Sequence, residues 1–471
     1  MNKLKVGIIF EGTYPYIVGG VSSWGNSLIS NMKDVEFCVI HVGDVPKKKA
    51  PKYNFPENVT DYFEYYLFAN YKFPKKRKIG KEITNALENI ISYPFDENLM
   101  GKDLYELFKK NPSLDFTSIF KSQFYWDTIV SFYEKYLPYE NFTNYYWTLY
   151  SMLIPILNSM TVDLPKCDIY HTITTGYAGI SAILNGLKYN VPVILTEHGI
   201  YHRERQLEIL RADWIKEEFK TGWIKLFNTI SSVVYKGSDK ITTLFSENQK
   251  YEKEFCSKEE KFLIIPNGID TNKFSNLTYR KSKTPFNVGL VGRVVEIKDI
   301  KTAIKAAKIV KQRIKDFKLF IIGPTDEEPE YFRECKELVD ILNLQDTVEF
   351  TGMVDVKEYY PELNLMILSS VSEGQPLVIL EAFAVGIPVV STNVGACREL
   401  IYGSKEDFIS PAGIVVKPKD FISLANAIIY MYENDKFRLN ASETGKKRVH
   451  MRYRLDQMIE NYKKLYLSVV K

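Results

Sequence analysis

The chain has 471 residues, too many for one ordinary domain, and a prior of about 150 residues per domain suggests two or three. Its composition, 45% hydrophobic and 25% charged, is typical of a globular protein and excludes a mainly disordered chain. The formal net charge of +4 gives no basis for a nucleic-acid-binding surface over the whole molecule, although it leaves room for a local basic site.

Cysteine usage and hydropathy indicate the compartment. The five cysteines lie far apart and form no CxxC pair, so neither a zinc knuckle nor a disulfide framework is expected. The apolar run near the start is only about five residues long, shorter than a signal peptide needs, and no stretch approaches the ~20 apolar residues of a spanning helix. We expect a cytoplasmic protein that reaches the membrane, if at all, through peripheral contact at its inner face.

Along the chain, apolar β-rich runs alternate with segments of helical period. The first run, KVGIIF (5–10), predicts a strand, and 22–32 predicts a helix. Further strands are expected at FCVIHV, DIYHTI, PVILT, KITTLF and FLIIP, with short helices at 176–187 and 246–255. Strands joined through helices run parallel, because a parallel pair needs a crossover connection. This series predicts a doubly wound α/β domain.

A second series of the same kind begins at FNVGLVG (286–292). It continues as helix 299–314, strand KLFIIG, helix 330–342, strand TVEFTG, helix 356–363, and strands LMILSS and PVVST. The boundary is expected in the polar, Lys-rich stretch 271–285. We therefore predict domains at 1–275 and 276–454, with a final helix in 455–471 that crosses back to the first domain.

The excess length of the first domain lies at about 44–164, which breaks the alternating rhythm and is rich in aromatic residues. We expect a largely helical insertion that buries those rings as a small core of its own. The alternative is a surface for a partner or a membrane. The basic runs at 47–49 and 75–78 are interpreted as solvated loop charges.

In open α/β sheets, ligands bind outside the carboxyl ends of the strands, so the residues there are the candidates. Gly19 and Gly20 precede the first helix, with Ser22 as its expected N-cap, and free helix amides favour an anion. His198 follows the strand PVILT. Either feature alone is also explained by an ordinary loop or a structural histidine. The chain has neither GxGxxG spacing nor a P-loop motif.

The second domain offers cations at its first strand end. Arg293 follows that strand and Lys298 comes five residues later. A guanidinium and an ammonium on one loop suit phosphate oxygens. Ordinary exposed charges are the competing interpretation.

The strongest local pattern is SEGQPLVILE (372–381). Glu373 lies on the loop after a strand, and Pro376 suits the first turn of the helix that follows. Glu381 lies about one turn into that apolar helix, where an ionised side chain needs a partner. Two carboxylates there can accept hydrogen bonds from hydroxyl groups at two points of one ligand. Cations, glycine amides and carboxylates together predict a nucleotide-activated sugar, bound in a cleft between the domains.

These motifs resemble a known family. The Glu373…Glu381 element, the basic pair Arg293 and Lys298 and the phrase PNGID (266–270) resemble the GT-B fold, retaining glycosyltransferases of family 4. GTYPYIVGGVSSW, TEHGIYHRER, GPTDEEPEYF and SEGQPLVILEAFAVGIPVVST are more similar to PelF-type glycosyltransferases of exopolysaccharide synthesis. The resemblance implies two Rossmann-like domains facing each other across a cleft, with the nucleotide sugar on the second and the acceptor on the side of the first.

For the second domain, the resemblance implies that Arg293 and Lys298 hold the donor diphosphate and stabilise the departing nucleotide. It places Glu373 at a hydroxyl of the donor sugar and Glu381 at the ribose. The chain has no Asp-x-Asp motif, so a diphosphate neutralised by this basic pair is expected rather than one bridged by magnesium. No metal and no other cofactor is expected.

The remaining assignments also follow from the resemblance. Backbone amides of Gln375 and Leu377 are expected at the sugar or the β-phosphate. Gly19 and Gly20 are expected at the phosphates, and His198 at the donor sugar or the reacting centre. No covalent nucleophile is evident, and the family suggests a front-face displacement with retention.

One difference from a related group of enzymes bears on the identity of the donor nucleotide sugar. Bacterial glycogen and starch synthases resemble the chain too, but usually carry Lys two residues before the glycine pair, where this chain has Ile17. This difference counts against an ADP-glucose glycogen synthase. PelF-type members are associated with UDP-glucose, so the resemblance implies transfer of a hexosyl unit from UDP-glucose, or a related UDP-sugar, to a growing exopolysaccharide or other glycan. The expected partners are the nucleotide sugar, the glycan acceptor and a membrane-associated polysaccharide synthesis complex, with no nucleic acid. The alternatives are a nucleotide-sugar epimerase and a non-catalytic component of such a complex.

Overall fold

The computed structural model describes residues 3–46, 50–69, 109, 123–404, 407 and 409–470. The chain forms two compact units, each described here by itself. The first unit comprises Met1–Thr243, Asn248–Ile264 and Tyr462–Lys471, and the second comprises Leu244–Glu247 and Ile265–Asn461. Among the described residues, no helix is long and apolar enough to cross a lipid bilayer.

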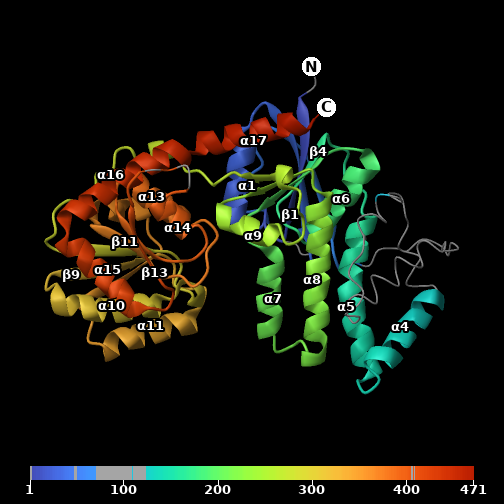
Figure 1. Cartoon of the computed structure of the whole chain (residues 1–471), viewed down its shortest axis with the longest axis horizontal. Coiled ribbons are helices and arrows are strands. Elements are labelled where there is room, and N and C mark those ends of the chain that lie inside the picture. The colour runs from blue at the N-terminus through green and yellow to red at the C-terminus, as the bar shows by residue number, and fades with distance from the viewer. Residues whose placement is uncertain are drawn as a thin grey trace. The chain divides into compact units, whose positions relative to one another are not determined.

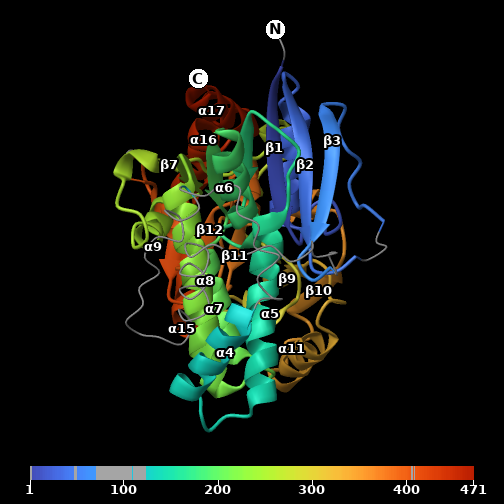
Figure 2. The same ribbon diagram turned by 90° about the vertical axis from the view of Figure 1, so that its right-hand side faces the viewer.

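The first unit is built on a parallel sheet in which seven strands are described, in the order β3-β2-β1-β4-β5-β6-β7. The strands are β1 (Leu4–Glu11), β2 (Val35–Gly43), β3 (Val59–Tyr66), β4 (Ile169–Thr172), β5 (Val193–Glu197), β6 (Lys240–Thr243) and β7 (Phe262–Ile264). Figure 2 shows β1, β2 and β3 as neighbouring arrows. Every residue of β4 and β5 is buried, as expected of a parallel sheet covered on both faces.

Helices connect these strands. They are α1 (Gly20–Asn31), α4 (Gln123–Tyr136), α5 (Phe142–Thr161), α6 (Tyr177–Tyr189), α7 (Tyr201–Arg211), α8 (Glu217–Gly237) and α9 (Gln249–Glu252), with 3₁₀ turns η2 (Ser246–Asn248) and η3 (Glu259–Lys261). Helices α7 and α8 pack side by side (Figure 1). Neither was predicted, although the buried Phe219, Trp223, Leu226 and Ile230 of α8 recur at helical spacing.

The predicted insertion at 44–164 needs a correction at its start, because 59–66 forms strand β3. This strand pairs with β2 in parallel and is the edge of the described sheet. Its sequence VTDYFEYY is rich in β-branched and aromatic residues, which favour strands. The basic run at 75–78 and most of 70–122 lie outside the described residues, as does the run at 47–49.

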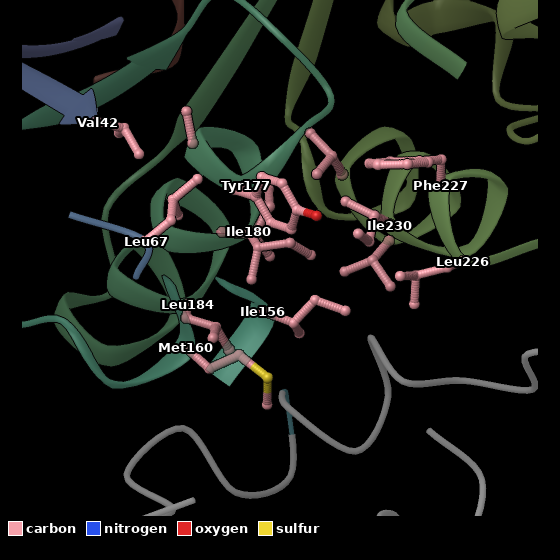
Figure 3. Packing of buried hydrophobic residues seen from close by; sticks show 14 of the residues in the cluster. Val42, Leu67, Ile156, Met160, Tyr177, Ile180, Leu184, Leu226, Phe227 and Ile230 are labelled. Atoms are coloured by element: carbon pink, nitrogen blue, oxygen red, sulfur yellow. The ribbon is translucent and has the colours of Figure 1, made fainter. Parts of the chain in front are cut away.

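The described helices of the insertion, α4 and α5, do not form a core of their own. Tyr125 and Ile129 of α4 and Tyr145 of α5 belong to the same buried cluster as the helices that cover the main sheet. Figure 3 shows Ile156 and Met160 of α5 beside side chains from α6 and α8 in this cluster. A mostly helical segment with buried rings at Tyr125 and Tyr145 agrees with the prediction, although Trp126 and Trp147 are about half exposed. The buried rings of the described helices join the main cluster rather than a core of their own.

The second unit has a parallel sheet of six described strands, in the order β10-β9-β8-β11-β12-β13. The strands are β8 (Phe286–Val291), β9 (Phe317–Ile322), β10 (Val348–Gly352), β11 (Leu365–Leu368), β12 (Val389–Thr392) and β13 (Gly413–Val416). The helices and 3₁₀ turns are η4 (Thr271–Phe274), η5 (Glu296–Lys298), α10 (Ile300–Arg313), α11 (Pro329–Ile341), α12 (Val356–Tyr359), η6 (Tyr360–Glu362), α13 (Leu377–Val385), α14 (Cys397–Tyr402), α15 (Phe421–Glu433), α16 (Asp435–Arg452) and α17 (Leu455–Val469). The order reverses direction between β8 and β11, the place where such sheets bind ligands.

The second unit begins earlier than the predicted boundary at 275/276, because PNGID is already part of it. The backbone N–H of Asn267 donates to the Gln375 side chain at 2.7 Å, and Ile269 pairs with Arg454. Phe274 is buried in a cluster of the second unit. These contacts explain why the unit starts at Ile265.

The last helix, α17, belongs to both units. It begins in the second unit at Leu455, and its residues from Tyr462 onward belong to the first. The buried hydroxyl of Tyr466 bonds His171 Nδ1 at 2.7 Å, and Tyr462 lies 3.2 Å from the Thr196 hydroxyl. These hydrogen bonds fix the end of the helix against β4 and β5.

Candidate functional site

The ends of β8 and β11 bring together two of the predicted site residues. Because the strands are neighbours, the loops that follow them lie side by side. Lys298 Nζ donates to Glu373 Oε1 at 2.6 Å, and the two side chains are 18% and 12% exposed. The predicted cation and the predicted sugar-binding carboxylate therefore form an ion pair at the carboxyl edge of the second sheet.

Hydrogen bonds hold this pair in place. The Ser370 hydroxyl donates to Glu373 Oε1 at 2.5 Å, and the Ser369 hydroxyl donates to the backbone carbonyl of Lys298 at 2.8 Å. An ammonium has three donors, so Lys298 keeps hydrogen-bonding capacity for an anion while it contacts Glu373. The arrangement is preorganised to place a positive charge and a hydrogen-bond acceptor next to one ligand.

Arg293 follows the same strand but holds a different carboxylate. Its Nη1 donates to both oxygens of Glu327, at 2.5 and 2.7 Å, and both side chains are about half exposed. Exposed pairs of this kind contribute about 0–1 kcal/mol, so a diphosphate can draw Arg293 away at little cost. The two predicted cations share a loop, and each is paired with its own carboxylate.

Glu381 has the partner that its apolar helix required. The hydroxyl of Tyr360, in η6, donates to Glu381 Oε2 at 2.6 Å. Burial raises the pKa of Glu381, while the Tyr360 bond and the positive charges of Lys357 and Lys273 oppose the rise. The remaining oxygen can accept a hydroxyl group of a ligand.

The loop between these carboxylates is held by close backbone approach. A Cβ on Gly395, whose φ is +50°, would lie 2.2 Å from the carbonyl oxygens of Glu373 and Gly374, so only glycine fits. The side chain of Gln375 binds both backbone groups of Asn267. Leu377 opens α13, and the first amides of a helix have no partner within it.

In the first unit, α1 starts two residues earlier than predicted. Gly19 is the N-cap and Gly20 the first helical residue, whereas Ser22, the predicted cap, lies buried inside the helix. A Cβ on either glycine would meet no atom within 4 Å. Packing within the chain therefore does not require glycine there, and the space beside both residues is open.

His198 lies directly after β5 and packs on α1. Its ring contacts Trp24 edge-on at a centroid distance of 4.6 Å. Burial lowers the pKa of His198 to about 4, so the imidazole is neutral near pH 7. Among the described residues, its buried Nε2 has no hydrogen-bond partner, which leaves this atom for a ligand.

The structure thus joins Lys298 to Glu373, with Arg293 on the same loop and Glu381 on the adjoining helix. Gly19, Gly20 and His198 belong to the other unit, and their meeting with the first set stays a prediction. Sequence reasoning missed Tyr360 and Glu327, which bind the predicted residues from distant segments. The contact of Trp24 with His198 was not predicted either, because the two residues lie far apart in the sequence.

Family models cover most of the chain. Residues 4–260, more than half of it, match the model described as "Domain of unknown function (DUF3492)". The chain belongs to this family. Residues 273–448 of this DUF3492 protein match the model described as "Glycosyl transferases group 1", and they contain the Lys298–Glu373 pair and Glu381.

Parts of the chain are also similar to individual curated glycosyltransferases. The DUF3492 protein is 30% identical over 171 residues to "Putative colanic acid biosynthesis glycosyltransferase WcaL" of Escherichia coli K12, covering 34% of this chain and 41% of the relative. It is 25% identical over 227 residues to "Capsular polysaccharide biosynthesis glycosyltransferase CapM" of Staphylococcus aureus, covering 46% and 57%. The chain thus spans about half the length of these curated relatives. The group 1 domain and these relatives support the prediction of a transferase enzyme.

The fold has relatives among solved structures. Anabaena Alr3699/HepE in complex with UDP matches 99% of this chain and 100% of its own, with a TM-score of 0.62 and 13% identity. At that identity the likeness concerns the fold alone. With the two parallel sheets, it confirms the predicted GT-B fold class.

Proposed function

We propose that this DUF3492 protein is a metal-independent glycosyltransferase that moves a hexosyl unit from a nucleotide sugar to a glycan. The observation that carries the proposal is the Lys298–Glu373 pair at the neighbouring ends of β8 and β11, inside the group 1 domain. The pair sets a cation for phosphate beside a carboxylate for hydroxyl groups.

The chemistry assigned to the second unit is charge stabilisation. The bond from the anomeric carbon to the diphosphate oxygen breaks while the acceptor hydroxyl oxygen bonds to the same carbon and passes its proton to the departing diphosphate oxygen. Negative charge grows on the departing nucleoside diphosphate as the bond breaks. Lys298 and Arg293 neutralise that charge, the part that a divalent metal would otherwise play. Glu373 accepts a hydroxyl of the donor sugar, and Glu381, held by Tyr360, accepts the ribose hydroxyls.

In the first unit, His198 acts as a neutral imidazole. Because burial keeps its pKa low, it contributes a directed hydrogen bond to the donor sugar rather than a positive charge. Gly19 and Gly20, at the start of α1 with open space beside them, offer backbone amides to the phosphates, because the first amides of a helix favour an anion. The amides of Gln375 and Leu377 have the corresponding task in the second unit.

We assign the donor as UDP-glucose or a related UDP-sugar, and the outcome as retention, on the resemblance to PelF-type members of family 4. HepE, which shares the fold, is described in complex with UDP. The acceptor is a growing exopolysaccharide, a choice supported by the colanic acid and capsular relatives. In this proposal the enzyme works in the cytoplasm, beside a membrane-associated synthesis complex.

The test is to incubate the purified chain with a panel of nucleotide sugars and glycan acceptors, with and without EDTA. We expect UDP release and a new glycosidic bond, unchanged by the chelator. An isomerised free nucleotide sugar would instead identify an epimerase. Binding without any turnover would identify a non-catalytic component, and loss of transfer in EDTA would contradict metal independence.

A further inference from the structure

The first unit contains a pocket that the proposed function leaves unassigned. It lies at the carboxyl ends of β1, β2 and β3, and its volume is about 120 Å³, room for several water molecules, so it can receive one side of a sugar ring without enclosing the whole ring. Its lining residues are Gly12, Tyr16, Ile17, His41, Gly43, Asp44, Val45 and Tyr66. Aromatic rings and polar groups converge there without a lysine or arginine among these residues.

A single carboxylate, Glu64 on β3, holds the aromatic wall. It accepts hydrogen bonds from the hydroxyls of Tyr16 at 3.0 Å and Tyr62 at 2.8 Å. Although burial opposes the effect, the hydroxyls of Tyr62, Tyr66 and Tyr16 hold the pKa of Glu64 below its usual value. Three tyrosines from two chain segments thus share one anion, which fixes the rings of Tyr16 and Tyr66 that face the pocket.

The polar wall offers hydrogen-bond acceptors. His41 Nδ1 lies 2.9 Å from the carbonyl oxygen of Tyr14, and because a carbonyl only accepts, Nδ1 carries the proton. Nε2 is therefore an acceptor, and it lies 3.3 Å from the position that a Cβ on Gly43 would take. Burial lowers the pKa of His41, so the ring stays neutral near pH 7. Asp44, which is exposed at the rim, adds a carboxylate.

The aromatic wall and the hydrogen-bond acceptors indicate which class of ligand the pocket binds. Sugar hydroxyls can donate to Nε2 of His41 and to Asp44, while the C–H face of a sugar ring suits the negative face of an aromatic ring. Among the described residues that line the pocket, a carboxylate or phosphate group would meet acceptors and a negative charge without a compensating cation; the basic run at 47–49 lies outside the described residues. We propose that this pocket is a saccharide subsite that takes one uncharged sugar ring of the acceptor, with Glu64 as a positioning residue. The acceptor role rests on the proposed function, whereas sugar binding does not.

Saturation-transfer NMR on the full chain tests the binding directly. The probes are methyl α-D-glucopyranoside, methyl β-D-galactopyranoside and the methyl glycoside of N-acetylglucosamine, with glucuronic acid as the anionic comparison. The variants are Asp44→Ala, whose exposed side chain makes misfolding unexpected, and Tyr66→Ala. The matched control is Tyr139→Ala, since Tyr139 is fully exposed and outside the pocket.

We expect at least one neutral probe to bind the wild type and Tyr139→Ala, and to bind both pocket variants at least about tenfold more weakly, the loss of a hydrogen bond to a charged group. Glucuronic acid should give no transfer. Equal binding by Asp44→Ala and the wild type, stronger binding of glucuronic acid, or no binding of any neutral probe would overturn the inference. If Tyr66→Ala unfolds by circular dichroism, Asp44→Ala decides.

A second measurement separates this inference from the proposed function. The KM for the glycan acceptor should rise in Asp44→Ala, while Tyr139→Ala should match the wild type both in that KM and in UDP release from the donor without an acceptor. A wild type that releases no nucleotide from any donor, yet binds neutral sugars, would refute the transferase and leave the subsite standing. The variant Glu64→Gln should raise the acceptor KM and leave kcat unchanged. A fall in kcat at an unchanged KM would contradict its positioning role.

Discussion

Lys298 and Glu373 are 75 residues apart in sequence, yet Lys298 Nζ donates to Glu373 Oε1 at 2.6 Å. The pair exists because β8 and β11 are hydrogen-bonded neighbours, so the residues after each strand meet at one edge. Mutual neutralisation keeps both charges satisfied until a ligand arrives. A diphosphate can then take the free donors of the ammonium while the carboxylate turns to a hydroxyl group.

Arg293 should matter to chemistry more than to stability. Replacing it in Arg293→Ala removes one cation from the leaving group, and we expect kcat to fall about 10²–10³-fold, as for loss of a donor in an oxyanion hole. The melting temperature should stay unchanged, because its pair with Glu327 is exposed. Arg313→Ala breaks a comparable surface pair with Glu433 and is the control. Full turnover in Arg293→Ala would remove this residue from the site.

Tyr360 should control donor binding through Glu381. The Tyr360→Phe variant deletes the hydroxyl that donates to Glu381, and a hydrogen bond to a charged group is worth about 1.5–3 kcal/mol. We expect the KM for the nucleotide sugar to rise about tenfold or more, with little change in kcat. Tyr402→Phe, which removes an acceptor for the Val415 N–H, should leave the KM as it is. An unchanged KM in Tyr360→Phe would show that Glu381 does not depend on this bond.

His198 predicts a pH dependence of stability. Burial lowers its pKa from 6.5 to about 4. Between these pH values the imidazole is therefore protonated in the unfolded chain and largely neutral in the folded protein. The stability that the neutral ring contributes is present above pH 6.5 and is lost as the pH falls toward 4. Unfolding in denaturant should show the wild type losing stability relative to His198→Asn across that range. A constant difference between the two proteins would contradict the buried neutral imidazole.

Glu252 predicts a pH dependence of stability with the opposite sign. Burial raises the pKa of this carboxyl from 4.5 to about 7, so the folded state holds a proton that the unfolded state releases. That contribution is complete below pH 4.5 and is lost as the pH rises to about 7. The Glu252→Gln variant, which cannot ionise, should therefore gain stability relative to the wild type between these values and stay level above them. If the stability of the wild type and that of Glu252→Gln changed in parallel with pH, the prediction would be contradicted.

Residues of the candidate site were predictable from the sequence where their position relative to a single strand or helix was enough to identify them. Glu373 and Lys298 were found because each follows an apolar run, and the carboxyl ends of parallel strands face the ligand. Glu381 was recognised because a carboxylate in an apolar helix needs a partner. The identity of that partner was not predictable, because Tyr360 reaches it from another chain segment. The same holds for Glu327 beside Arg293.

The errors in the fold have similar causes. Strand β3 was assigned to a helical insertion because its aromatic residues obscured the alternation of an edge strand. The start of α1 was placed at Ser22 because serine is a common N-cap, whereas Gly19 occupies that position. The pocket at β1–β3 depends on register between strands, since Tyr16, His41 and Tyr66 carry no shared motif. Only the paired strands bring them to one edge.

Sugar transfer in this proposal depends above all on Lys298 and Glu373 acting together on a nucleotide sugar. The most direct measurement is the rate of UDP release with formation of a glycosidic bond, compared among the wild type, Lys298→Ala and Lys311→Ala. Lys311→Ala is the control, because Lys311 also forms an ion pair, with Asp346, but this pair lies on the surface. We predict transfer by the wild type and Lys311→Ala and at least a hundredfold loss in Lys298→Ala, the order of one removed oxyanion donor. Equal rates in all three proteins would contradict the claim.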